Sequence, residues 1–132
     1  MTSVLIVDDE PELRDVIGAG LGLVIQKLQV HEAVSGRDAM LKIQSLQLDL
    51  IICDVSMPNG SGHDVLTFLK ESGSRIPIII FTALTDKRCI SSEYSGLRGI
   101  FDKRQFNQLL DSVEVFNGPS DDKLNLISTG TR

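Results

Sequence analysis

The sequence has no tryptophan, only two cysteines and no long hydrophobic run, and each absence excludes a class of protein. Cys53 and Cys89 are too few for a disulfide framework or a zinc site, so both are expected to be free thiols. The longest stretch of apolar residues and glycines, 16–25, is too short to span a bilayer. The N-terminus lacks the basic and apolar regions of a signal peptide. We therefore expect a cytoplasmic protein without membrane contact.

An excess of positive charge is also missing. The 13 lysines and arginines are outnumbered by 18 acidic residues, which gives a net charge of -5. This balance argues against direct nucleic-acid binding, which needs a basic stripe. The 132 residues suffice for one domain with a real core.

Five short apolar runs alternate with helical patterns along the chain. The third and fourth runs are continuous and rich in isoleucine, as in strands that are buried on both faces of a parallel sheet. The helical pattern after the first run begins near Pro11 and extends to Leu28, and Ser35 with Asp38 resembles a helix-capping pair. The five runs are 3–7, 28–34, 49–53, 76–81 and 99–101.

This alternation predicts an α/β fold. We expect a flavodoxin-like doubly wound (βα)5 sandwich with a parallel five-stranded sheet in the order 2-1-3-4-5. Residues 1–117 would form the domain, and residues 118–132 a tail or linker. The weakest helix prediction is 85–97, because this segment is polar and has little apolar periodicity.

Polar residues stand where the predicted strands end. Asp8 and Asp9 follow the first strand, Asp54 follows the third, Thr82 ends the fourth and Lys103 follows the fifth. The carboxyl ends of parallel strands share one edge of the sheet, where ligands bind. In the expected order the first and third strands are neighbours, so the three aspartates would converge.

Three converging carboxylates raise one another's proton affinity unless a cation is bound. Hard oxygen ligands at a wet site suit Mg²⁺, which often helps to hold phosphate. A carboxylate can also attack phosphorus and form an aspartyl phosphate. A lysine and a hydroxyl close by would stabilise the charge on a transferred phosphoryl group. Together these residues predict transfer of a phosphoryl group onto Asp54.

Two simpler interpretations explain less of the sequence. The acidic residues 8–10 could only favour the start of the first helix, but this would not explain Asp54 and Lys103 at the same edge. The glycines of GAGLG, residues 18–22, do not follow a strand directly, as a dinucleotide-binding turn requires. Close packing of this helix against a neighbour is the better interpretation.

Four segments, in this order, resemble the response-regulator receiver domain of two-component signalling, a CheY-like family. The resemblance covers roughly residues 3–116. The matching segments are LIVDDEPEL (5–13), IICDVSMPNGSG (51–62), IIIFTAL (78–84) and GIFDK (99–103).

The resemblance implies a role for each matching residue. Asp54 would be the phosphoacceptor, and Thr82 and Lys103 would bind phosphoryl oxygens. Mg²⁺ would be held by Asp9, Asp54 and the backbone carbonyl of Ser56, with Asp8 acting through a bound water. Phe101 would turn inward when Thr82 moves toward the phosphate, so that the surface formed by segment 85–97, the fifth strand and the last helix reports the change.

The resemblance also implies partners. A sensor histidine kinase or a histidine phosphotransfer protein would supply the phosphoryl group from a phosphohistidine. A downstream effector or a C-terminal output domain would receive the signal, and a homodimer is left open. Apart from its own phosphorylation and dephosphorylation, the chain would not be an enzyme.

One departure from the family leaves an alternative. The family usually has Lys-Pro after the fifth strand, whereas Lys103 is followed by Arg104. We expect a trans peptide or a reshaped loop there, because a cis bond without proline costs about 2.5–4 kcal/mol. If Lys103 failed to reach Asp54, the chain would be a phosphorylation-independent interaction module.

Two other functions fit the sequence less well. A phosphohydrolase that uses Asp54 as its nucleophile would carry a second acid at position 56, where this chain has Ser56. A flavin-binding protein would need aromatic stacking at a less acidic site.

Overall fold

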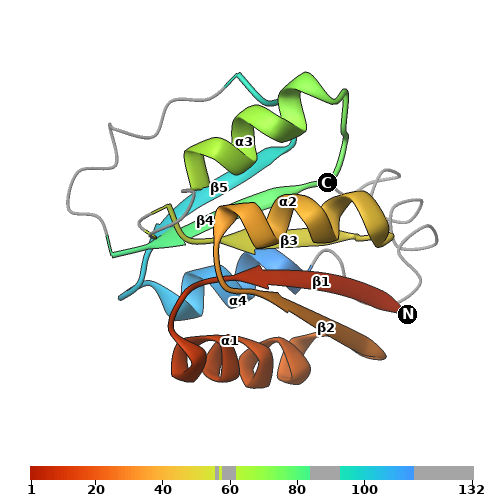
Figure 1. The fold of residues 1–132 in the computed structure, drawn as a ribbon. Helices are drawn as coiled ribbons and strands as arrows, with labels where there is room; N and C mark the ends of the chain where they lie inside the picture. The colour runs from red at the N-terminus through yellow and green to blue at the C-terminus, as the bar shows by residue number, and fades with distance from the viewer. Residues whose placement is uncertain (56, 58–61, 84–92, 115–132) are drawn as a thin grey trace, which may run out of the picture.

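The computed structural model describes residues 1–55, 57, 62–83 and 93–114 of the chain, and in this part strands and helices alternate from β1 to β4 (Figure 1). The described strands form one parallel sheet in the order β2-β1-β3-β4-β5, which confirms the predicted flavodoxin-like topology. The elements in chain order are β1 (Thr2–Val7), α1 (Pro11–Val24), β2 (Leu28–Ala33), α2 (Gly36–Ser45), β3 (Leu50–Cys53), α3 (Gly62–Glu71), β4 (Ile78–Thr82), β5 (Leu97–Asp102) and α4 (Phe106–Val113).

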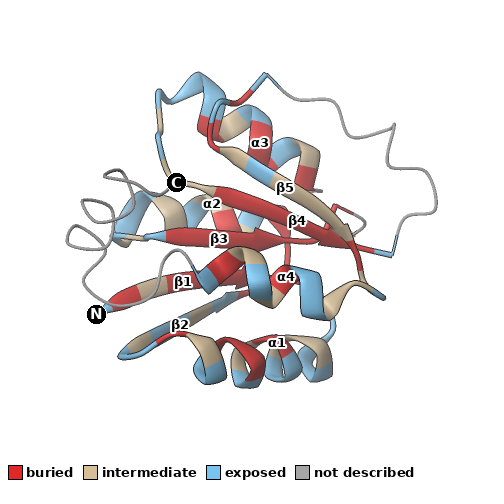
Figure 2. Cartoon of the chain, turned by 180° about the vertical axis from the view of Figure 1, so that it is seen from behind, coloured by how far each residue is buried: buried red, intermediate tan, exposed pale blue. Residues whose placement is uncertain are grey.

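The sheet lies between two layers of helices. Helices α2 and α3 cover one face, and α1 and α4 cover the other (Figure 1). Every residue of β3 and β4 is buried, as Figure 2 shows in red, whereas the edge strand β2 is largely exposed. The isoleucine-rich runs therefore form the centre of the sheet, as predicted from their composition.

The start of α2 follows the predicted capping pattern. The Ser35 side chain accepts a hydrogen bond from the backbone N–H of Asp38, at 3.1 Å. The Asp38 carboxylate in turn accepts from the backbone N–H of Val34, at 3.1 Å. The two side chains thus satisfy donors at the beginning of the helix and fix where β2 ends and α2 starts.

Two helix predictions differ from the structure. Helix α1 ends at Val24 rather than near Leu28, because Lys27 has a positive φ of 54° and turns the chain into β2. Residues 93–96 form a turn before β5 begins at Leu97, so the helix expected over 85–97 is wrong at its C-terminal end. Its residues 85–92 lie outside the described part, as do residues 118–132, expected to form a tail or linker.

The glycines of α1 differ in their surroundings. A Cβ on Gly20 would lie 2.5 Å from Cζ of Phe106 in α4, so the two helices approach closely at this point. A Cβ on Gly22 would meet nothing within 4 Å. Close packing therefore explains Gly20 but not Gly22.

None of the helices in the described part of the chain combines the length and the apolar character needed to cross a bilayer.

Candidate functional site

The side chains that follow β1, β3, β4 and β5 meet at the carboxyl edge of the sheet. Asp8 and Asp9 come from the turn after β1, and Asp54 follows β3, which is hydrogen-bonded to β1. Thr82 is the last residue of β4, and Lys103 follows β5. The sheet order thus brings together residues from four segments that are distant in the sequence.

The three aspartates form a compact acidic group. Each offers a carboxylate oxygen, and these oxygens lie within 4.8 Å of one another. Asp8 and Asp54 are buried, with 1% and 3% of their surface exposed, whereas Asp9 is exposed. Burial raises the pKa of the Asp8 carboxyl, although the backbone N–H of Glu10 and the charge of Lys103 act in the opposite direction.

Lys103 supplies positive charge to this group. Its Nζ lies 3.0 Å from Oδ2 of Asp8 and 3.1 Å from Oδ2 of Asp54. Burial lowers the pKa of the ammonium group, but the hydrogen bond to Asp8 and the charge of Asp54 outweigh it, so the net shift is upward. Lys103 is therefore protonated at neutral pH and bridges the two buried carboxylates.

Thr82 lies on the other side of Asp54. Its hydroxyl donates a hydrogen bond of 2.8 Å to Oδ1 of Asp54. Because Lys103 contacts Oδ2, both carboxylate oxygens of Asp54 have a donor within hydrogen-bond distance. The same two donors could bind the oxygens of a phosphoryl group attached to Asp54.

Phe101 lies next to this site on β5. Its partner on β4 is Phe81, the residue before Thr82. The Phe101 side chain is half-buried and packs against the core between the sheet and helices α1 and α4. Its ring lies close to Gly99, where an added Cβ would be 3.0 Å from the ring. Glycine at position 99 leaves room for this ring position.

The loop after Lys103 accommodates Arg104 with a trans peptide bond. The backbone N–H of Arg104 donates to Oδ1 of the buried Asp102, at 2.9 Å. The exposed guanidinium also pairs with Asp102, at 3.0 Å. A proline at position 104 would lack this N–H, so the loop is built differently from a Lys-Pro loop while Lys103 still reaches Asp54.

The acidic group has the donor set that a hard divalent cation requires. Carboxylate oxygens from Asp8, Asp9 and Asp54 are the preferred ligands of Mg²⁺, and the exposure of Asp9 leaves room for the waters that Mg²⁺ retains. The residues present therefore fit this ion. Ser56, whose carbonyl was predicted as a further ligand, lies outside the described residues.

Cys53 immediately precedes Asp54 but is not exposed to the site. The thiol is fully buried, and burial raises its pKa. Cys53 is a free thiol, as expected from the sequence, and it lies in the core.

One residue near the site was missed from the sequence. Nη1 of Arg14, in the first turns of α1, donates to the backbone carbonyl of Asp8 at 2.7 Å. Nothing in the sequence distinguishes Arg14 from the other charged residues of this helix, because its partner at the site is a backbone carbonyl.

A family model described as the response regulator receiver domain matches residues 4–114. The chain belongs to this family. The receiver domain therefore carries an acidic pocket formed by Asp8, Asp9 and Asp54 at the expected edge of the sheet.

Relatives of this receiver domain include an enzyme and a response regulator. A protein-glutamate methylesterase/protein-glutamine glutaminase of Nocardioides sp. is 32% identical over 67% of the chain, and the match spans 24% of that protein. The response regulator SaeR of Staphylococcus epidermidis is 36% identical over 66% of the chain and 37% of its own length. The chain thus spans only a quarter to two-fifths of these relatives.

A solved structure also matches closely. The response regulator TrrA of Thermotoga maritima, in complex with Mg²⁺ and BeF, superimposes with a TM-score of 0.75 at 28% identity. The match covers 86% of this chain and 97% of TrrA. The fold of the receiver domain is thus that of a protein which itself binds Mg²⁺.

Proposed function

We propose that this receiver domain is a phosphorylatable switch in which Asp54 accepts a phosphoryl group from a phosphohistidine. The observation that carries the proposal is the pair of contacts at Asp54, 2.8 Å to the Thr82 hydroxyl and 3.1 Å to the Lys103 ammonium. These two donors stand where the oxygens of a phosphoryl group attached to Asp54 would need them.

The transfer step involves few atoms. An oxygen of the Asp54 carboxylate attacks phosphorus, and the O–P bond forms while the P–N bond of the phosphohistidine breaks. The imidazole nitrogen keeps the electron pair of that bond and takes up a proton. Lys103 and Thr82 stabilise the charge on the phosphoryl oxygens during transfer.

Asp8, Asp9 and Asp54, with the backbone carbonyl of Ser56, would hold Mg²⁺, which neutralises further charge on the phosphoryl oxygens. Asp8 would act mainly through a metal-bound water. The bound Mg²⁺ in TrrA and the three clustered carboxylates support this assignment.

The signal would leave the site through β4 and β5. Phosphorylation adds about two negative charges at neutral pH, which would draw the Thr82 hydroxyl toward the phosphoryl group. Phe101, whose strand is paired with that of Thr82, would then turn inward. The surface around β5 and α4 would change with it, together with residues 85–97, of which 85–92 lie outside the described part.

A sensor histidine kinase or a histidine phosphotransfer protein would be the phosphodonor, and the family membership supports such a partner. The signal would pass to a downstream effector or to a C-terminal output domain, and a homodimer remains an option. The chain itself would have no enzymatic activity beyond its own phosphorylation and dephosphorylation, nor bind nucleic acid or membrane.

Three further expectations belong to this proposal. Residues 1–117 would be the receiver domain and 118–132 a tail or linker, which agrees with a family match that ends at residue 114. The protein would act in the cytoplasm. The alternative of a phosphorylation-independent module relied on Arg104, and it has less support now that Lys103 lies 3.1 Å from Asp54.

The test is phosphorylation by a small donor. The protein is incubated with acetyl phosphate and Mg²⁺, and the intact mass is recorded for wild type and for Asp54→Asn. We expect a gain of one phosphoryl group in wild type, none in the variant, and loss of the gain with EDTA. An unchanged mass of the wild type at every donor and Mg²⁺ concentration would overturn the proposal.

A further inference from the structure

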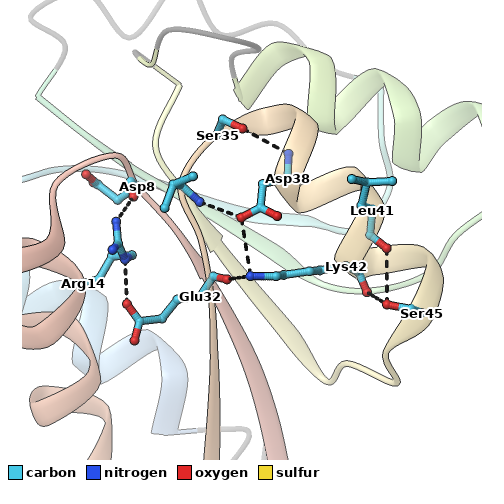
Figure 3. Close-up of polar contacts among 9 residues, drawn as sticks. Asp8, Arg14, Glu32, Ser35, Asp38, Leu41, Lys42 and Ser45 are labelled. Atoms are coloured by element: carbon cyan, nitrogen blue, oxygen red, sulfur yellow. Dashed lines mark hydrogen bonds and ion pairs between the residues drawn. The ribbon is translucent and has the colours of Figure 1, made fainter.

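Arg14 connects the turn that carries two of the aspartates to the edge strand of the sheet (Figure 3). Its Nη1 donates to the backbone carbonyl of Asp8 at 2.7 Å, and its Nε lies 2.6 Å from Oε1 of Glu32 in β2. Only 12% of the Arg14 side chain is exposed. The guanidinium is thus held between the two elements rather than extended into solvent.

The carbonyl that Arg14 contacts has a special position in the chain. The backbone N–H of Asp8 still bonds to Ala33 of β2, and the carbonyl of Val7 accepts from Asp54, but the Asp8 carbonyl lies beyond the sheet ladder. It belongs to the peptide unit that joins Asp8 to Asp9. A buried carbonyl needs a donor, and among the described residues Arg14 provides it.

We propose that Arg14 is a positioning residue for the Mg²⁺ site. By holding the peptide between Asp8 and Asp9, it fixes the directions in which both carboxylates leave the backbone, and so lowers the reorganisation that metal binding requires. This inference rests on the proposed function only in that it takes these carboxylates as ligands of Mg²⁺.

The contacts beyond Arg14 explain why its position is fixed. Lys42 of α2 donates to the backbone carbonyl of Glu32, and its Nζ lies 3.4 Å from Oδ2 of Asp38 (Figure 3). Glu32 is therefore held by its backbone as well as by its side chain. A guanidinium presents several N–H groups in a rigid plane, so Arg14 contacts Asp8 and Glu32 at once, which the single ammonium of a lysine does less well.

The direct test measures Mg²⁺ binding without any phosphodonor. Mg²⁺ is titrated calorimetrically into wild type, Arg14→Met and Arg14→Lys. Loss of a group that orients metal ligands typically weakens binding by about 10- to 100-fold, so we expect the dissociation constant of Arg14→Met to rise at least about tenfold. Arg14→Lys should fall between the two proteins.

A matched control removes another paired cation. Lys70, near the end of α3, pairs with Glu93 at 2.5 Å and does not contact the aspartates. Lys70→Met should bind Mg²⁺ as the wild type does. If Lys70→Met and Arg14→Met lost the same Mg²⁺ affinity, the loss would come from removing one positive charge, and the positioning role would be overturned.

Urea unfolding in EDTA separates positioning from a purely structural role. If Arg14 had only a structural role, Arg14→Met would unfold at lower urea concentration, but its folded fraction would bind Mg²⁺ as tightly as wild type does in the calorimetric titration. That combination of results would overturn the inference. If Arg14→Met does not fold, Glu32→Gln keeps the arginine but weakens its anchor, and a several-fold loss of affinity is expected; an unchanged affinity there would count against the inference.

The two proposals fail in different ways. A wild type that binds Mg²⁺ but gains no phosphoryl group contradicts the proposed function and leaves the role of Arg14 intact. A wild type that is phosphorylated while Arg14→Met binds Mg²⁺ equally well contradicts only the role of Arg14. A wild type that binds no Mg²⁺ overturns the positioning role.

Discussion

Asp8 and Asp54 are buried side by side, and both contact the ammonium group of Lys103. An ion pair alone would lower the pKa of Asp8, yet burial outweighs it and the net shift is upward. In the metal-free protein the ionised Asp8 therefore costs folding free energy. This cost can be measured.

We predict that Asp8→Asn is more stable than wild type at pH 7 in EDTA. The pKa of Asp8 is higher in the folded protein than its ordinary value of 3.8, so the folded state binds the proton more tightly. The relative stability of wild type should therefore improve as pH falls through the raised folded pKa toward 3.8. Urea unfolding at several pH values should show the advantage of Asp8→Asn shrinking over this window.

The exposed carboxylate next to Asp8 provides the control for this experiment. Asp9→Asn removes one negative charge from the same turn without removing a buried group, so its stability should stay within about 0.5 kcal/mol of wild type. A wild type that is more stable than Asp8→Asn at pH 7 would contradict the prediction.

The sequence located most of the residues that meet at this site. Asp8, Asp9, Asp54, Thr82 and Lys103 were found because each stands at the end of a predicted strand, and topology alone then brings them together. Arg14 was not found, because its contact is with a backbone carbonyl, and side-chain sequence carries no sign of which carbonyl lacks a partner.

Helix α1 contains glycines in two different environments, and they give a prediction for the packing of this element. Gly20→Ala places a Cβ 2.5 Å from the ring of Phe106, so the ring or the helices must shift, at a cost of about 1–3 kcal/mol. Gly22→Ala meets nothing within 4 Å and should stabilise the helix by up to about 1 kcal/mol. Thermal or urea unfolding of the two variants measures both changes.

The two variants differ only in position along one helix, so each is the control of the other. If both substitutions were stabilising, α1 and α4 would have more space between them at Gly20 than the 2.5 Å from an added Cβ to the Phe106 ring implies.

The strands and helices were predicted best where every residue of the element is buried. β3 and β4 were predicted well because strands buried on both faces are continuously apolar. The end of α1 was predicted poorly, because the apolar spacing continues through Leu28 and nothing in the sequence reports the positive φ of Lys27.

At the scale of the whole molecule, metal binding should stabilise the fold. A ligand that binds only the folded state at about 100 times its dissociation constant adds about 2.7 kcal/mol to the free energy of unfolding. We predict such a gain for wild type when Mg²⁺ is added, and a smaller one for Asp54→Asn, which lacks one carboxylate. Urea unfolding with and without Mg²⁺, at constant ionic strength, measures the gain.

The comparison with the variant decides whether the gain comes from the acidic group. Equal gains in wild type and Asp54→Asn would place the stabilising ion elsewhere. KCl at matched ionic strength should give neither protein a comparable gain, because a monovalent salt only screens the charges.

The hydrogen bond from the backbone N–H of Arg104 to Asp102 affects how the loop after β5 could change by mutation. The Asp102 carboxylate is oriented by a backbone N–H that any residue except proline supplies. A single substitution to the Lys-Pro form would delete that donor while Asp102 is still in place, so the two positions are coupled. A lineage moving between the two loop forms would tolerate the change more readily if position 102 were altered first, which makes the order of the two mutations matter.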